Sequence, residues 1–271
     1  MGHSTVRVAS GSIMASMRIA WQLSPASLAV AVVIAFSPMV APSRVAPIVV
    51  GEGPLGGVII ALDPGHNGGN AAHAAEIRRR VWIGNGYKPC NQVGTSTRSG
   101  YPEHRFNFDV ALRVKAALEK LGATVYLTRP SDTGFGPCVD VRGKFGEKVH
   151  ADLAVSIHAD GAGATSRGFF VMKPGLVAGY TDDIRTKSGV LSTAVRNGLT
   201  DAGLSIANYY AKNGLITRTD LGTLNWSDVP IVMIELGNMK NATDAARMTS
   251  PSGRTRYADG IVLGIRRYLG R

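Results

Sequence analysis

The amino-acid sequence predicts a single α/β domain, in which helices cover both faces of a mostly parallel, twisted central sheet. Short apolar runs that end in polar loop residues alternate along the chain with segments whose apolar residues recur at helical spacing. This alternation is typical of a sheet covered by helices on both faces. The chain has 271 residues, 45% of them hydrophobic, so it can fill one sizeable core.

The first half of this pattern begins with a strand near Gly57. The run VIIALDPGHNGG is apolar until Asp, Pro and Gly residues break it, which predicts a buried strand that leads into a loop. Residues 70–101 show no steady periodicity, and a loop of this length in a compact domain is more often functional than idle. Residues 103–121 have the apolar spacing of an amphipathic helix, Gly122 stops that helix, and residues 123–129 alternate as a strand.

The second half repeats the alternation of strands and helices. Residues 151–160 and 230–238 are apolar runs that end in polar residues, and both predict buried strands. We also expect helices at residues 139–150, 188–202 and 257–269, a strand at residues 168–174, and a strand or loop at residues 215–226. The sequence contains no internal repeat or low-complexity linker, so one domain accounts for the whole pattern.

The charge balance restricts the class of partner. The chain carries 30 Lys and Arg residues against 19 Asp and Glu residues, a formal net charge of +11, so its surface should attract polyanions. Nucleic acid and an anionic cell wall both fit this charge. No arginine-rich helix, zinc-finger spacing or aromatic RNA-binding strand accompanies it, so we expect no nucleic-acid partner.

The N-terminal region has the composition of an export signal. The first fifty residues contain no Asp or Glu, and Arg18 precedes an apolar stretch over residues 26–36 that small residues follow. This stretch is shorter than the roughly 20 residues that a membrane-spanning helix needs, so we expect cleavage rather than a stable membrane anchor. Residues 1–46 are therefore predicted to be signal and leader, and residues 47–271 to be exported to the periplasm, the cell wall or the medium.

The two cysteines, Cys90 and Cys138, both lie in the part predicted to be exported. In an oxidising compartment such a pair is usually a disulfide, which here would tie down the long segment around Cys90. Two unrelated buried thiols are the alternative. Joint metal ligation is disfavoured, because neither residue belongs to a C-x-x-C motif.

Three of the expected strands carry a metal-binding or catalytic type of residue near their carboxyl ends. These residues are His66, His158 and Glu235, and ligands gather at this edge in open α/β sheets. A catalytic zinc ion takes three nitrogen or oxygen ligands and keeps a fourth position for water, so two convergent imidazoles would suit it. The alternative is that these side chains only cap the helices that follow.

Five short segments together resemble the zinc-dependent N-acetylmuramoyl-L-alanine amidases, the type with a His-Glu-His metal site. In chain order these segments are DPGHNGG, Glu103 with Asn107 four residues on, VYLTR, SIHAD and IVMIELGN. They occur in the order and approximate spacing of the family and span about residues 57 to 269. Any one segment alone would be weak, whereas the agreement of five is specific.

This resemblance implies the cofactor and the roles of four residues. His66, Glu103 and His158 would bind Zn²⁺, and Glu235 would be the catalytic residue. The residue types suit that chemistry, because a bound zinc ion polarises the scissile carbonyl and lowers the pKa of its water to about 7. A carboxylate beside the metal can then take the proton of the water and return it to the departing amine.

The resemblance also implies the reaction and the substrate. A single catalytic domain over residues 47–271 would hydrolyse the amide between N-acetylmuramic acid and the L-alanine that starts the peptidoglycan stem peptide. The substrate would be peptidoglycan itself or a muropeptide. We expect the protein to be a monomer, because the sequence shows no exposed heptad pattern.

Glu103 has a competitor for the metal among its neighbours. It lies at the start of the expected helix, where an acid also complements the helix dipole, and His104 beside it could face the metal instead. The step to Asn107 matches the family through Glu103. Two positions, Asp160 and Asn238, depart from the family pattern, and both bear on substrate contacts rather than on the metal.

Two other functions remain open on the same residues. The first is another exported zinc hydrolase, such as a stem-peptide peptidase or a glycan deacetylase, because the same metal and carboxylate would serve each reaction. The second is a wall-binding protein without activity, in which the zinc ion is structural and fully ligated.

Overall fold

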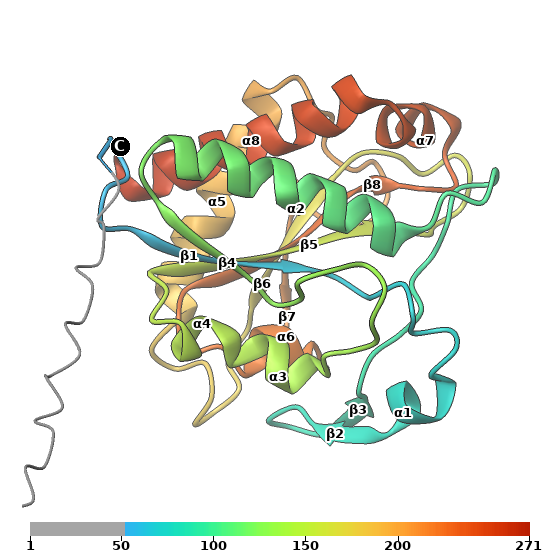
Figure 1. Ribbon diagram of the computed structural model, residues 1–271, viewed down its shortest axis with the longest axis horizontal. Coiled ribbons are helices and arrows are strands. Elements are labelled where there is room, and N and C mark those ends of the chain that lie inside the picture. The colour runs from blue at the N-terminus through green and yellow to red at the C-terminus, as the bar shows by residue number, and fades with distance from the viewer. Residues whose placement is uncertain (1–51) are drawn as a thin grey trace, which may run out of the picture. The chain divides into compact units, whose positions relative to one another are not determined.

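The computed structural model describes residues 52–271, so the predicted export signal lies outside the described residues. A six-stranded sheet runs between two layers of helices (Figure 1). Its strands are β1 (Ile59–Pro64), β4 (Thr124–Leu127), β5 (Leu153–Asp160), β6 (Phe170–Pro174), β7 (Leu215–Arg218) and β8 (Ile231–Asn238). The predicted α/β class is confirmed.

The strand order across this sheet is β4-β1-β5-β8-β6-β7. Every neighbouring pair is parallel except β6 and β8, which run antiparallel, so the prediction of a mostly parallel sheet is also confirmed. The strands β1, β5 and β8 are adjacent and point the same way. Their carboxyl ends therefore meet at one edge of the sheet, where the predicted site residues lie.

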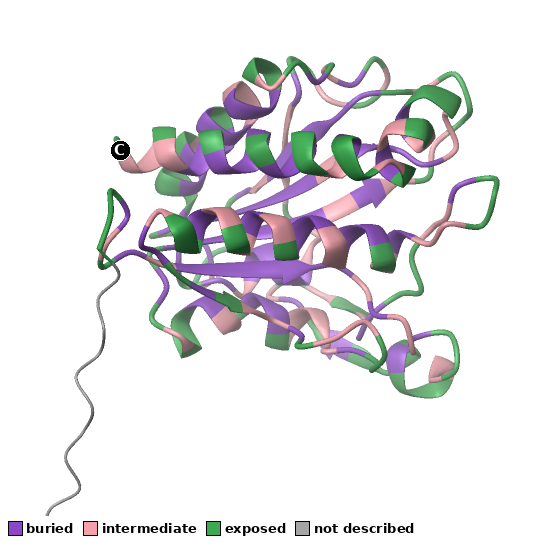
Figure 2. Ribbon diagram, turned by 45° about the horizontal axis from the view of Figure 1, so that its top comes forward, coloured by how far each residue is buried: buried purple, intermediate pink, exposed green. Residues whose placement is uncertain are grey.

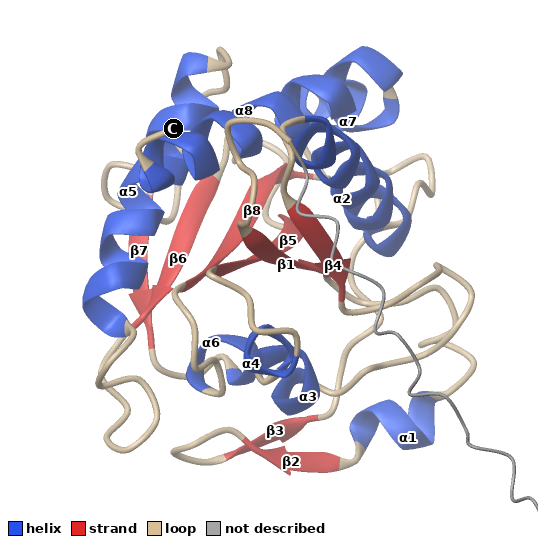
Figure 3. Ribbon diagram, turned by 60° about the vertical axis from the view of Figure 1, so that its left-hand side comes forward, coloured by secondary structure: helices blue, strands red, loops and turns tan. Residues whose placement is uncertain are grey.

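Helices cover both faces of the sheet, and the two layers differ in thickness. The eight helices within residues 52–271 are α1 (Ala74–Arg78), α2 (Glu103–Lys120), α3 (Val139–Gly143), α4 (Phe145–Lys148), α5 (Arg185–Asp201), α6 (Gly222–Asn225), α7 (Ala242–Thr249) and α8 (Pro251–Leu269). The long helices α2, α5 and α8 lie on one face, and the short helices α3, α4 and α6 lie on the other (Figure 3).

Alternation along the strands explains how the sheet supports both layers. On β5 and β8, residues such as Val155 and Ile234 belong to the larger apolar cluster with α2, α5 and α8. Their neighbours Ala154 and Met233 belong to the second cluster, on the side of the short helices. The central strands β5 and β8 are consequently buried on both sides, while the outer faces of the helices are exposed (Figure 2).

The closing helix α8 has clear start and stop signals. The Ser250 side chain accepts a hydrogen bond from the Gly253 amide, Pro251 occupies the first turn, and Gly270 ends the helix in a left-handed conformation. The helix therefore begins six residues before the predicted start at Tyr257. Within residues 52–271, no helix is long and apolar enough to cross a membrane.

Three predicted segments differ from the structure in detail. The helix expected over residues 139–150 is two short helices that divide at Lys144, and Gly143 and Gly146 pack closely on Trp226 and Val229. The segment 70–101 contains helix α1 and a small hairpin, whose strands are β2 (Arg80–Trp82) and β3 (Tyr87–Pro89). The segment 215–226 divides into strand β7 and helix α6.

Candidate zinc site and active-site cleft

A cleft of about 930 Å³ lies at the carboxyl ends of the central strands. His158 on β5 and Glu235 on β8 are paired in register on adjacent parallel strands, so their side chains leave the same face of the sheet. His66 follows β1 within two residues, and Glu103 is the first residue of α2. All four predicted metal-binding and catalytic residues line this one cleft.

His66 stands on a sharply turned backbone. Its φ angle of 59° is in the left-handed region, which residues other than glycine rarely adopt. The buried Arg142 holds this turn, because its guanidinium donates to the main-chain oxygens of Pro64 and His66 at 3.0 and 2.7 Å. The same guanidinium forms a 2.6 Å ion pair with Asp63, so the turn is tied to the end of β1.

A second buried arginine supports the same turn. Arg129 is 1% exposed and donates to the main-chain oxygen of Pro64 at 2.8 Å and to that of His104 at 2.7 Å. It thereby links the loop after β1 to the first turn of α2. The sequence pattern suggested no role for Arg129 or Arg142: Arg129 is only the last residue of the VYLTR segment, and Arg142 belongs to none of the five segments.

The imidazole of His66 is oriented by the long segment before α2. Its Nδ1 lies 2.9 Å from the main-chain oxygen of Gln92, which leaves Nε2 directed at Glu103. The amide of Asn70 donates to the same Gln92 oxygen at 2.7 Å, while its own oxygen accepts from the Gly136 amide at 2.8 Å. A carbonyl that is hydrogen-bonded to one imidazole nitrogen fixes the orientation of the ring and leaves the other nitrogen free to bind a metal.

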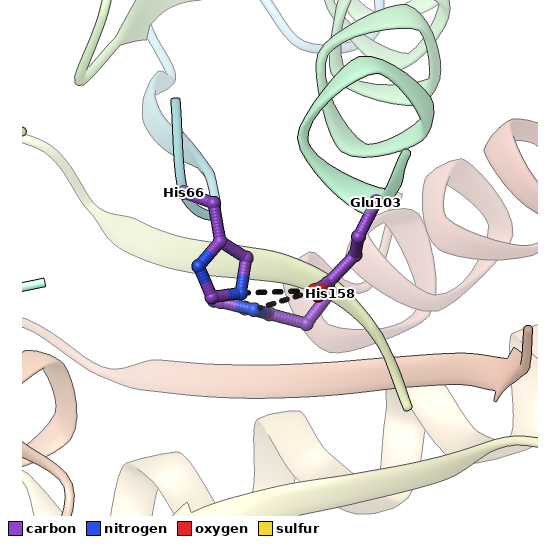
Figure 4. Close-up of side chains that lie close together, drawn as sticks. All are labelled: His66, Glu103 and His158. Carbon is purple, nitrogen blue, oxygen red and sulfur yellow. Dashed lines mark hydrogen bonds and ion pairs between the residues drawn. The ribbon is translucent and has the colours of Figure 1, made fainter. Parts of the chain in front are cut away.

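Glu103 is buried, although it is the first residue of a helix. Its Oε1 lies 3.1 Å from Nε2 of His66 and 3.1 Å from Nδ1 of His158 (Figure 4). The Ala159 amide also donates to Oε1 at 3.1 Å, and the Thr95 amide donates to Oε2 at 2.9 Å. The Glu103 side chain therefore contacts the two histidines of the site and does not cap the helix.

His66, Glu103 and His158 offer one ligand atom each, and these atoms lie within 4.8 Å of one another. Burial alone would raise the pKa of Glu103, but the two imidazoles beside it hold the pKa well below its usual range. Burial lowers the pKa of His158. Burial alone would also lower the pKa of His66, but the Glu103 carboxylate raises it. These directions favour an ionised Glu103 beside a neutral His158, whereas a metal ion would have to displace the proton that His66 binds more tightly than usual.

Two glycines allow the ligands to come this close. A Cβ atom on Gly65 would lie 2.1 Å from Cε1 of His158. A Cβ atom on Gly94 would lie 2.8 Å from Oε2 of Glu103 and 3.0 Å from Cδ2 of His66. Both backbones therefore pass directly against the ligand side chains.

Glu235 lies within β8 rather than after it, and its Oε2 atom is buried without a hydrogen-bond partner among the described residues. Burial raises the pKa of Glu235 well above its usual range, and the nearby carboxylates of Glu103 and Asp160 add to the shift. A buried carboxylate oxygen without a partner costs free energy, and a group that is absent from the polypeptide would satisfy it.

The other residues singled out in the sequence have separate roles. His104 points its Nδ1 at Asp132 at 2.8 Å and is not part of the metal-binding group. Asp160 accepts a 2.6 Å hydrogen bond from the hydroxyl of Tyr209 beside the cleft. Asn238 is buried, and its amide donates to the main-chain oxygens of Gly163 and Ser166, so it shapes the loop after β5.

Cys90 and Cys138 form a disulfide in the structure. It joins the segment before Gln92 to the residue that precedes α3, the helix that carries Arg142. The disulfide thus links the two segments that carry the groups bonded to His66, namely the Gln92 oxygen and the Arg142 guanidinium. The expectation that Cys90 ties down the long segment agrees with this position.

Comparison with known proteins places nearly all of the described part of the chain in one family. The sequence profile described as N-acetylmuramoyl-L-alanine amidase matches residues 60–267. The N-acetylmuramoyl-L-alanine amidase Rv3717 of Mycobacterium tuberculosis is 41% identical over 217 residues, which are 79% of this chain and 88% of that protein. The probable cell wall amidase LytH of Staphylococcus saprophyticus is 27% identical, over 80% of this chain and 60% of that protein.

Solved structures give the same assignment. The crystal structure of the amidase Ami1 from Mycobacterium smegmatis has a TM-score of 0.75 and 42% identity, and covers 79% of this chain and 97% of that chain. The corresponding protein of Mycobacterium abscessus has a TM-score of 0.74 and 41% identity, over 79% of this chain and 99% of that chain. With a matching profile, close relatives and a shared fold, the chain belongs to the N-acetylmuramoyl-L-alanine amidase family of hydrolases.

Proposed function

We propose that this protein is an exported, zinc-dependent N-acetylmuramoyl-L-alanine amidase in which His66, Glu103 and His158 hold the metal. The observation that carries the proposal is the group of two imidazoles and one buried carboxylate, with ligand atoms within 4.8 Å of one another. Zinc favours three such ligands in catalytic sites and keeps a further position open. The Gln92 oxygen on Nδ1 of His66 supplies the outer-sphere hydrogen bond that metal-bound histidines usually make.

Glu235 is the proposed proton-transfer residue. When bound, zinc would polarise the scissile carbonyl and acidify a water molecule. Glu235 is the neighbour of His158 in the sheet but not a member of the ligand group, so its carboxylate is free to accept a proton. The raised pKa of this buried carboxyl suits a group that takes a proton and then returns it to the departing L-alanine amine.

The proposed substrate is peptidoglycan or a muropeptide outside the cytoplasm. The family supports this substrate, and two of the relatives carry the names of an N-acetylmuramoyl-L-alanine amidase and a probable cell wall amidase. Loss of the predicted signal would remove three arginines and lower the formal net charge from +11 to +8. A basic surface would favour contact with an anionic wall.

The substitution Glu235→Gln tests the proposed mechanism, because it keeps the size of the side chain and removes the proton acceptor. We expect release of stem peptides from purified sacculi to fall by at least about a hundredfold, with zinc content unchanged. The control is Glu119→Gln, an exposed carboxylate on α2. Turnover by Glu235→Gln at the wild-type rate would overturn the assignment.

The products separate this amidase from the other hydrolases that fit the same residues. An amidase releases intact stem peptides with a new L-alanine amine, a peptidase shortens the stems, and a deacetylase releases acetate. Mass spectrometry of digested sacculi distinguishes the three. We expect intact stems, and shortened stems or free acetate would contradict the proposal.

A further inference from the structure

A cluster of charged residues lies at the end of the cleft opposite the ligand group. Arg218 ends strand β7, and its Nε and Nη2 atoms pair with the two oxygens of Asp220 at 2.7 and 2.9 Å. Nζ of Lys88, on strand β3, lies 3.6 Å from the same carboxylate. All three residues line the cleft. One carboxylate between two cations leaves this end of the cleft with net positive charge.

The third nitrogen of the guanidinium has neutral partners. Within the described residues, Nη1 of Arg218 contacts the hydroxyl of Tyr210 at 3.3 Å and Sδ of Met172 at 3.8 Å. Both are weak acceptors compared with a carboxylate, whose hydrogen bonds with arginine are shorter and about twice as strong. The edge of the guanidinium formed by Nε and Nη2 is therefore paired with Asp220, whereas Nη1 is available to a ligand in the cleft.

The floor between this cluster and the catalytic carboxylate is apolar. Going from β8 to β7, the cleft passes Glu235 and Met233 on β8 and then Phe170 and Met172 on β6 before it reaches Arg218. Two strand intervals separate β8, which carries Glu235, from β7, which is about 10 Å at the usual spacing of strands in a sheet. An extended peptide advances about 3.3 Å per residue, so this distance corresponds to about three residues.

We propose that Arg218 and Lys88 form a subsite for a carboxylate of the stem peptide, a few residues beyond the amide bond that is cut beside Glu235. This inference rests on the proposed amidase function and specifies which peptides the cleft prefers. The ligand is an acidic peptide with a free carboxylate on its second or third residue. The same peptide with a carboxamide at that position lacks the charge and binds more weakly.

A purely structural role for Arg218 makes a different prediction. The ion pair with Asp220 is partly exposed, with 24% and 44% of the two side chains accessible, and it joins the last residue of β7 to the short loop that follows. If holding that loop were its only purpose, replacement of Arg218 would affect charged and amidated substrates equally. A carboxylate subsite requires that the effect depend on the charge of the substrate.

The experiment compares three muramoyl tripeptides with the zinc-loaded protein. One has all carboxylates free, one has a carboxamide on the second residue, and one has a carboxamide on the third. We expect kcat/KM of the wild type to be about tenfold higher for the free acid than for one of the two amides, and that amide identifies the position recognised. Arg218→Met should reduce this preference to within about twofold, and Arg218→Lys should retain an intermediate preference.

Two further variants sharpen the result. Asp220→Asn removes the competing carboxylate, so the preference for the free acid should increase. Arg256→Met replaces an exposed arginine on α8, outside the residues that line the cleft, and should keep the wild-type preference. Circular dichroism checks that each variant is folded, and Arg218→Gln, which also removes the charge, replaces Arg218→Met if the latter is not.

The outcomes separate this inference from the proposed function. A wild-type protein that cuts all three peptides equally, or an Arg218→Met protein that keeps the full preference, would overturn the subsite while leaving the amidase intact. A wild-type protein that cuts none of them would overturn the proposed function and the subsite with it. A preference that Arg218→Met abolishes and Arg256→Met retains supports the subsite.

Discussion

At the scale of single residues, the site depends on backbone that passes close to ligand side chains. Gly65 faces the ring of His158, and Gly94 faces Glu103 and His66. Gly65 does not have a positive φ angle, so alanine could adopt its backbone conformation. The space beside His158 is therefore what requires glycine at this position, which makes Gly65 a useful probe of the metal site.

The substitution Gly65→Ala should displace His158 and weaken zinc binding. Its Cβ atom would lie 2.1 Å from the imidazole, far closer than any real contact, so the ring has to move. We expect zinc affinity to fall by about tenfold or more, as found when the surroundings of metal ligands are altered. Competition with a chromogenic chelator measures this, and Gly86→Ala, where the new Cβ meets nothing within 4 Å, is the control. Equal affinities in the two variants would refute the close approach.

Asp63 is a buried charge that links the site to the sheet. Burial alone would raise its pKa, but the Arg142 guanidinium and the hydroxyls of Thr128 and Ser156 lower it to about 2, from an ordinary value of 3.8. A carboxyl group whose pKa is lower in the folded state than in the unfolded state stabilises the folded protein at pH values above the unfolded pKa. This contribution is lost as the pH falls from about 4 towards 2.

The substitution Asp63→Asn should therefore have a pH-dependent cost. At pH 7 we expect the free energy of unfolding to fall by about 2 kcal/mol from the pKa difference alone. The difference between the two proteins should shrink as the pH decreases below 4. Urea unfolding of both proteins across this range measures it, and a difference that does not vary with pH would contradict the ionised Asp63–Arg142 pair.

At the scale of elements, helices α5 and α8 pack through glycines. A Cβ atom on Gly198 of α5 would lie 2.3 Å from the Gly264 amide nitrogen and 2.5 Å from the Gly260 oxygen, both on α8. These are backbone atoms, which cannot move aside as a flexible side chain can. The close crossing lets the two helices share the larger apolar cluster, with Leu199 of α5 and Ile261 of α8 fully buried.

Replacing Gly198 by alanine should force these helices apart. We expect a loss of about 1 to 3 kcal/mol in the free energy of unfolding, which is usual for overpacking. Gly189→Ala on the same helix is the matched control, because its nearest neighbour would be the end of a lysine side chain at 3.7 Å. That control should stabilise the protein by up to about 1 kcal/mol. Stabilisation by both substitutions would exclude the close crossing.

The sequence predicts long elements better than short ones. Apolar periodicity located α2 within one residue of its end, because it buries one continuous face, including Phe106, Val110 and Val114. The hairpin of β2 and β3 was not predicted, since three-residue strands carry almost no periodic signal. It is held by distant partners such as Trp226, whose Nε1 donates to the Trp82 oxygen. Such tertiary contacts cannot be read from local pattern.

At the scale of the whole molecule, the parallel sheet brings distant residues together. His66 and His158 lie 92 positions apart in sequence, and the sheet places both at one edge because β1 and β5 are parallel neighbours. This much follows from strand patterns. The groups that orient the ligands could not be predicted, because they are a main-chain oxygen at Gln92 and a buried guanidinium at Arg142, and neither has a sequence motif of its own.

The disulfide also belongs to the whole molecule. Cys90 and Cys138 are separated by 48 residues, and their bond joins the two segments that carry these orienting groups. The disulfide could be predicted from the presence of two cysteines and from the expected export alone. That this disulfide joins the segments that orient the metal ligands can be seen only in the structure.

The most direct test of the central claim is the metal content of the purified protein together with the products it releases from sacculi. We expect one zinc ion per chain and release of intact stem peptides with a free L-alanine amine. Chelation should abolish this release, and added zinc should restore it. Release of the same peptides at an unchanged rate by metal-free protein would show that the amidase reaction does not depend on zinc.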